Sequence, residues 1–67
     1  MKSGLVIRRG TEYLARKGKN VRMDEAGYFW AADIQKARVY ADYASAYRIA
    51  SRAGGKVWTM RNGRVEE

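Results

Sequence analysis

Alternating apolar and polar positions near the start of the chain predict an antiparallel hairpin. Its strands are expected over 5–9 and 12–17, with a tight turn at Gly10-Thr11 between them. A second turn is expected at 18–20, and a third extended segment, after a further turn, around Tyr28-Phe29-Trp30. Aromatic and β-branched residues favour such half-buried extended positions. The first thirty residues are therefore predicted to form strands.

A helical period replaces this alternation in the middle of the chain. Residues 33–53 contain no Gly or Pro and are rich in Ala. After Asp42, apolar residues recur at three- and four-residue spacing and predict one buried helix face, made of Tyr43, Ala46, Tyr47, Ala50 and Ala53. Arg48 and Arg52 fall on the other face, and Gly54-Gly55 is expected to end the helix.

The segment 33–53 allows one continuous helix or two separate pieces. Asp33 and Asp42 each precede an apolar run, as N-caps do, and Val39-Tyr40 is typical of extended chain. We favour a short helix over 33–37, an extended segment over 38–40 and a main helix that begins after Asp42.

The C-terminal pattern predicts one more strand over 56–61, a turn at Asn62-Gly63 and a flexible acidic tail over 64–67. The whole chain, 1–67, is expected to be a single small α+β domain. An antiparallel sheet of about three to four strands would pack against one main helix, with a short additional helix.

The residues that most often carry catalysis are missing from this chain. It has no His and no Cys, which removes the commonest general base, the commonest metal ligand and the best nucleophile. Gly54-Gly55-Lys56 lacks the spacing of a phosphate-binding loop. We therefore expect no catalytic, cofactor-binding or metal-binding residues, and a protein that is not an enzyme.

The N-terminal apolar run is only three residues long, Leu5-Val6-Ile7. A signal peptide needs about 7–15 apolar residues, and a membrane-spanning helix about 20. We expect a cytoplasmic protein that does not act in a membrane.

Positive charge is concentrated at the N-terminal end. The chain carries 14 basic and 7 acidic residues, a net charge of +7. Residues 1–23 hold seven bases and one acid, for +6; residues 24–47 hold two bases and four acids, for −2; and residues 48–67 hold five bases and two acids, for +3. The predicted hairpin is thus the electropositive end.

Strand alternation suggests which of these bases are presented together. If Leu5 and Ile7 face the core, Val6 and Arg8 point outward, and Arg8 is expected to share a face with Arg16. The candidate binding residues are basic or aromatic side chains of this region: Arg8, Arg9, Arg16, Lys17, Lys19, Arg22, Tyr28 and Trp30. They indicate a binding surface for nucleic acid or an acidic protein, although a basic face can also serve only solubility.

Eight aromatic residues are many for 67 positions. Five of them are expected mainly in the core, where a small domain needs bulky side chains: Phe29, Tyr40, Tyr43, Tyr47 and Trp58. Tyr28 and Trp30 would share one strand face, and if exposed beside Arg they would form a stacking platform or a protein hot spot.

Several short segments in the second half give the chain a resemblance to small phage-encoded accessory proteins. They are Trp30-Ala31-Ala32-Asp33, Lys36-Ala37-Arg38-Val39-Tyr40, Ser45-Ala46, Ile49-Ala50 and Gly54-Gly55-Lys56-Val57, and the resemblance covers about half of the chain. Some proteins of this kind inhibit host defence, including anti-CRISPR proteins.

The resemblance implies a non-catalytic inhibitor that binds a host protein or ribonucleoprotein with an acidic surface. The alternative is a sequence-nonspecific module that binds RNA or DNA directly. A third possibility is a structural protein whose exposed aromatics make contacts between copies.

Overall fold

The computed structural model describes residues 3–65, which form an α+β fold with a six-stranded antiparallel sheet. Its strands are β1 (Gly4–Arg9), β2 (Glu12–Ala15), β3 (Arg22–Met23), β4 (Phe29–Ala31), β5 (Lys56–Arg61) and β6 (Arg64–Val65). Their order in the sheet is β3-β4-β2-β1-β5-β6. The helical elements are a 3-10 turn, η1 (Ile34–Lys36), and an α-helix, α1 (Tyr43–Ala53). The sheet is larger than the three to four strands predicted, because the two-residue strands β3 and β6 extend its edges.

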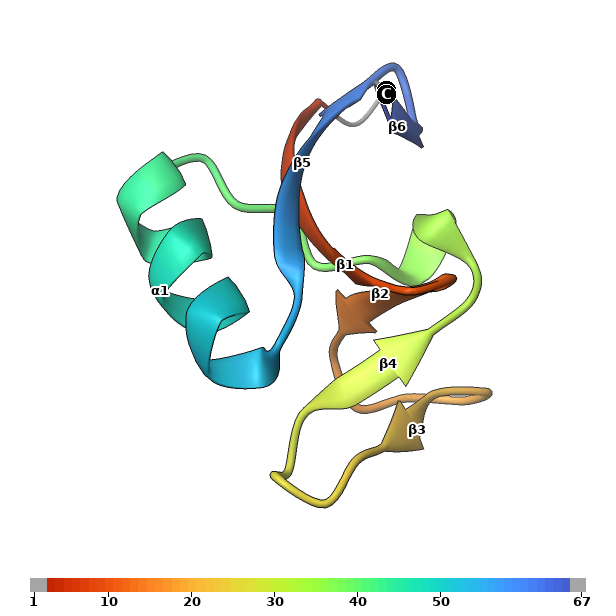
Figure 1. Cartoon of the computed structure of the whole chain (residues 1–67). Coiled ribbons are helices and arrows are strands. Elements are labelled where there is room, and N and C mark those ends of the chain that lie inside the picture. The colour runs from red at the N-terminus through yellow and green to blue at the C-terminus, as the bar shows by residue number, and fades with distance from the viewer. Residues whose placement is uncertain (1–2, 66–67) are drawn as a thin grey trace.

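The sheet is strongly bent, and its two faces are covered by different elements. Figure 1 shows α1 on one side of β1 and β5, with η1 on the opposite side. On the face of the sheet that α1 covers, Ile7, Leu14 and Trp30 pack against Ala50 and Ala53. Small Ala side chains let α1 approach the sheet closely, so the large core residues come from the strands.

A second core cluster lies on the other face of the sheet. There Val6 and Met60 pack with Ala37, and the partly buried Ile34 and Val65 lie against them. Val6 is fully buried, whereas the alternation of the hairpin had placed it outward. That prediction is wrong because the sheet is covered on both faces, so consecutive residues of β1 can both be buried.

The helical region is divided as predicted. Asp33 caps η1 by accepting a hydrogen bond from the Gln35 amide, and Asp42 caps α1 by accepting from the Ala44 and Ser45 amides. The Ser45 hydroxyl also donates to Asp42, and this bond is the main reason that the pKa of Asp42 lies below its ordinary value. The break into two pieces is therefore confirmed.

Two glycines end α1 for two different reasons. Gly54 has a φ of 79°, a left-handed conformation that side chains disfavour, and it closes the helix. At Gly55 a Cβ atom would lie 2.9 Å from Cγ2 of Ile7 and 3.0 Å from the Arg8 carbonyl oxygen. The chain can therefore turn from α1 into β5 directly against β1.

The segment after η1 fills the space where β1 and β2 diverge. The Arg38 amide donates to the Leu14 carbonyl at 2.8 Å, while Tyr40 and Leu5 exchange two backbone hydrogen bonds of 2.7 and 2.8 Å. This connection ties the predicted extended segment 38–40 to both strands of the first hairpin.

The predicted strand boundaries differ most at the hairpin and at the C-terminus. The second strand ends at Ala15 rather than at residue 17. Arg64 and Val65 form β6 instead of belonging to a flexible tail, while residues 66 and 67 of that predicted tail lie outside the described residues. Over residues 3–65, no helix is long and apolar enough to cross a membrane.

Candidate functional site

Arg9 and Trp30 contact each other and Asp24, so both take part in interactions that stabilise the fold. Trp30 is fully buried, and its indole Nε1 donates a 2.8 Å hydrogen bond to Oδ2 of Asp24. The Arg9 guanidinium lies 4.1 Å from the Trp30 ring centroid and 3.2 Å from the same carboxylate oxygen, and it also donates to the Ala53 carbonyl. We call Arg9, Asp24 and Trp30 the internal cluster. Because Trp30 is buried, it cannot form the exposed platform that the sequence suggested.

Asp24 organises both this cluster and the turn before β4. Its Oδ1 accepts hydrogen bonds from the amides of Ala26 and Tyr28 at 3.0 and 2.9 Å. The bond from Trp30 is the main reason that the pKa of Asp24 lies below its ordinary value; partial desolvation opposes this effect, while the two amides and the Arg9 charge add to it. The sequence had indicated only a turn here.

Three other predicted binding residues also have partners within the protein. The Arg8 guanidinium lies 5.9 and 5.5 Å from the ring centroids of Tyr13 and Trp58, and its Nε donates to the Gly10 carbonyl at 3.0 Å. Arg22 forms an ion pair with Glu12, and Tyr28 is partly buried against the core beneath α1. None of the three lines the groove described next.

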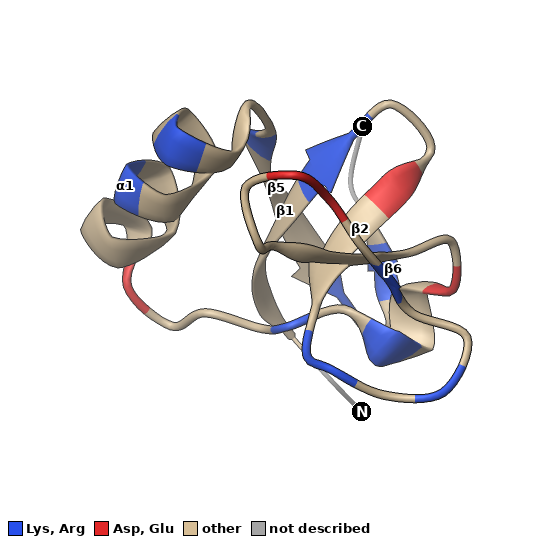
Figure 2. Ribbon diagram, turned by 90° about the horizontal axis from the view of Figure 1, so that it is seen from below, with Lys and Arg blue, Asp and Glu red and all other residues tan. Residues whose placement is uncertain are grey.

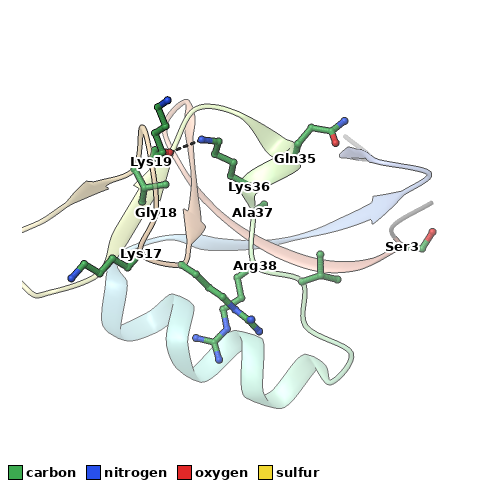
Figure 3. A pocket seen from close by; sticks show the side chains of 11 residues that line it. Ser3, Lys17, Gly18, Lys19, Gln35, Lys36, Ala37 and Arg38 are labelled. Atoms are coloured by element: carbon green, nitrogen blue, oxygen red, sulfur yellow. Dashed lines mark hydrogen bonds between the residues drawn. The ribbon is translucent and has the colours of Figure 1, made fainter.

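Five basic residues line one open groove on the surface. They come from two stretches of chain that are distant in sequence: Arg16, Lys17 and Lys19, and then Lys36 and Arg38. The groove has a cavity volume of about 690 Å³, and none of the described residues that line it is acidic. We call it the basic groove. Figure 3 shows Lys17 and Lys19 on one wall, with their ammonium groups directed outward, and Lys36 and Arg38 on the other wall.

Backbone pairing holds the two walls of the basic groove together. Ala15 and Ala37 form an antiparallel bridge at the end of β2, and the Arg38 amide donates to the Leu14 carbonyl, so segment 36–38 lies against the end of β2 where Arg16 begins the other wall. The Lys36 ammonium donates to the Lys19 carbonyl across the groove, as the dashed line in Figure 3 marks. The Arg38 guanidinium lies 5.3 Å from the Tyr40 ring centroid. The fold thus fixes the groove although most of its residues lie outside the strands and α1.

The predicted shared face of Arg8 and Arg16 is wrong. Arg8 pairs with Tyr13 in the β1–β2 ladder and points with it toward Trp58, whereas Arg16 follows the end of β2 and lines the basic groove. Residues directly opposite in an antiparallel ladder point to the same face, so Arg8 follows Tyr13 and not Arg16.

The groove has the positive charge to hold an anion. Arg16 and Lys17 are exposed, and within residues 3–65 no hydrogen bond or ion pair involves their side chains. Clustered cations on a shallow surface raise the local concentration of anionic partners. Among the described residues there is no group of three or more His, Cys, Asp or Glu side chains that could hold a metal ion.

A second exposed surface lies on α1, where the sequence predicted core residues. Tyr43 and Tyr47 are 60% and 58% exposed, and their rings stack with centroids 6.0 Å apart at an interplanar angle of 23°. Both tyrosines lie beside the contact line of α1, which consists of the small residues Ala46, Ala50 and Ala53. The prediction of a buried Tyr43 and Tyr47 is wrong because this close Ala contact leaves no room for rings between helix and sheet.

The tyrosine pair is accompanied by basic side chains. Tyr43, Tyr47, Arg48 and Arg52 line one shallow cavity on the helix, and we call these four residues the tyrosine platform. Figure 2 shows basic positions along α1 and an acidic one only where the chain leads into it. Like the groove, this surface is positively charged.

Sequence reasoning missed Lys36, Arg38 and the tyrosine platform as site residues. Lys36 and Arg38 lie in the segment 24–47, which has a net charge of −2. Net charge counted over that segment therefore did not indicate a basic site. The signal in the sequence was that Lys36 and Arg38 are two residues apart, at the start of the predicted extended segment 38–40, and so can point to the same side. For the tyrosines, the available signal was their spacing of four followed directly by Arg48.

The fold and its surfaces define a small α+β protein with a basic groove. No protein-family model matches the chain, and no curated protein or solved structure shows significant similarity to it.

Proposed function

We propose that this chain is a non-catalytic binding protein that holds the phosphodiester backbone of a nucleic acid in the basic groove. One observation carries the proposal: five cations from two distant stretches of chain line a single groove, with no acidic residue among its described lining. Such an arrangement is repulsive in isolation and becomes favourable when an anion occupies it. Binding would release counterions from the phosphates, which is the main source of nonspecific affinity for nucleic acids.

The composition of the groove favours a phosphate backbone over an acidic protein. Its aliphatic lining residues are small, Val21, Ala37 and Val39, and no aromatic side chain lines it. Stable protein interfaces usually centre on buried Trp, Tyr or Arg anchors in well-packed pockets. An open basic groove without such anchors suits a flexible polyanion better, and contacts to phosphates carry no sequence information.

The phosphate backbone could belong to free RNA or DNA, or to RNA exposed on a host ribonucleoprotein. The second source corresponds to the inhibitor that the resemblance to phage accessory proteins implies, including an anti-CRISPR role. Both sources present the same chemistry to Arg16, Lys17 and Arg38. The ligand common to both sources is the phosphodiester backbone, and binding measurements on free RNA and on a ribonucleoprotein distinguish them.

The test uses two charge-reversal variants with the same change in net charge. Arg16→Glu/Lys17→Glu alters the groove, and Lys56→Glu/Arg64→Glu alters exposed cations that do not line it. Surface substitutions of this kind usually change stability by about 0.5 kcal/mol or less each. Wild type is expected to bind a fluorescent single-stranded oligonucleotide with a Kd of about 10⁻⁴–10⁻⁶ M near physiological salt, as nonspecific binders do.

The groove variant should lose most of this binding, while the matched control should keep most of it. Equal losses in the two variants would contradict the groove and leave only a general charge effect. Much tighter binding to a ribonucleoprotein than to its free RNA would assign the source to the complex. Binding of polyglutamate in place of nucleic acid would overturn the phosphate proposal.

A further inference from the structure

The tyrosine platform is unusual because it exposes large aromatic side chains that a small domain normally buries. Tyr43 and Tyr47 are each more than half exposed, whereas Ala46 and Ala50 in the same turns of α1 are buried. The two rings contact each other and so form one continuous aromatic surface. The fold does not use this surface in either of its core clusters.

The charges around the platform limit what could cover it. The helix sequence from Tyr43 to Ala53 contains Arg48 and Arg52 and no acidic residue, and the carboxylate of the N-cap Asp42, just before it, interacts with the Arg48 charge. Both arginines line the same shallow cavity as the tyrosines, together with Ala44 and Ser51. An occupant must therefore offer a flat apolar face to the rings and negative charge to the guanidinium groups.

We propose that the tyrosine platform stacks the bases of a single-stranded nucleic acid, while Arg48 and Arg52 contact its phosphates. Bases supply flat π faces and the backbone supplies the charge, the combination on which single-strand binding surfaces depend. This inference rests on the proposed function and adds to it a preference for unpaired strands. In a duplex the base faces are covered by their neighbours, so the tyrosines would have nothing to stack on.

Other occupants fit the platform less well. A second copy of the chain would bring Arg48 and Arg52 toward their own counterparts, and juxtaposed like charges at an interface cost several kcal/mol. A protein partner could use Tyr and Arg as anchors, but the second positive surface, the basic groove, favours a polyanion on both. These occupants become outcomes of the experiment.

The decisive probe is a pair of oligomers of equal length and charge, one a pyrimidine single strand and the other an abasic strand that has the backbone alone. Their affinities are measured by fluorescence anisotropy for wild type, for Tyr43→Leu/Tyr47→Leu and for Tyr43→Phe/Tyr47→Phe. Leu retains helix propensity and Phe retains the rings, and circular dichroism checks that both variants fold.

Wild type is expected to bind the base-containing strand about tenfold or more tightly than the abasic strand, since stacking contributes on the order of 1–3 kcal/mol per base. The Phe variant should keep this preference. The Leu variant should bind both strands equally, at the wild-type affinity for the abasic strand.

The other results separate the two proposals. If wild type binds both strands with equal affinity, the groove proposal stands and the platform proposal fails. If it binds neither strand at low salt, both proposals fail. A Leu variant that keeps the preference for bases, or that loses affinity for the abasic strand as well, would also overturn the role of the tyrosines. So would self-association of wild type in sedimentation that the Leu substitutions abolish.

Discussion

The internal cluster and the basic groove use the same type of residue in opposite ways. Arg9 lies against Trp30, 3.2 Å from the Asp24 carboxylate, and its charge is balanced within the fold. Arg16 belongs to the same N-terminal block of positive charge, yet it lines a groove whose described residues include four further cations and no acid. A run of basic residues in sequence is therefore not one surface, and only the local partners decide which cations remain available for binding.

The same contrast holds for the aromatic residues. Trp30 combines full burial with a satisfied indole N–H, which is how a polar aromatic group is retained in a core. Tyr43 and Tyr47 expose their rings next to Arg48 and Arg52, and the acid at that end of the helix is the N-cap Asp42. Mutations in the two regions should therefore affect different properties, stability in the first and binding in the second.

The largest expected effect is the loss of the central aromatic side chain. Trp30→Ala should cost about 3–5 kcal/mol, because it removes a fully buried ring and leaves a cavity. Since small domains are stable by only about 5–15 kcal/mol, much of that stability would be lost. Denaturant unfolding measures the change.

Tyr47→Ala is the matched control, and it should shift the free energy of unfolding by no more than about 0.5 kcal/mol. Comparable losses in the two variants would mean that the division into internal and exposed aromatics is wrong.

The next effect concerns pH and the internal cluster. Because the pKa of Asp24 is lowered by folding, its carboxylate stabilises the fold fully above the unfolded value of about 3.8, and this contribution is lost as pH falls through the lowered folded value. Asp24→Asn should melt at a lower temperature than wild type at neutral pH, and its melting temperature should fall less on acidification below pH 4. Asp33→Asn, at the cap of η1, should keep the neutral melting temperature of wild type, since Asn caps helices about as well as Asp. An unchanged acid response in Asp24→Asn would contradict the role of this carboxylate.

Local signals in the sequence were sufficient for most of the fold. The caps Asp33 and Asp42, the Gly54-Gly55 pair and the strand pattern over 56–61 each specify their element through nearby residues, and the structure confirms them. The two-residue strands β3 and β6 carry too short a pattern to be recognised. They form because Met23 and Val65 can pair with strands that are already in place.

The candidate site depended on contacts between distant segments, and for that reason the sequence predicted it less well. Nothing near Arg38 indicates that its amide binds the Leu14 carbonyl and so brings its segment against the end of β2. Nothing near Arg9 indicates that Asp24 will neutralise it across fifteen residues. Charge counts along the chain identified Arg16, Lys17 and Lys19, but they could not separate these residues from the internally paired Arg9 and Arg22.

The most direct test of the central claim is the salt dependence of binding to a single-stranded oligonucleotide. For single strands, the slope of log affinity against log salt concentration is about −0.7 per phosphate neutralised. The neutral variant Arg16→Gln/Lys17→Gln should therefore reduce the steepness of the wild-type slope by about 1.4, with the free energy of unfolding nearly unchanged. The control Lys56→Gln/Arg64→Gln should keep the wild-type slope. A groove variant with the wild-type slope, or a control that loses as much steepness as the groove variant, would contradict the claim that the basic groove holds the backbone.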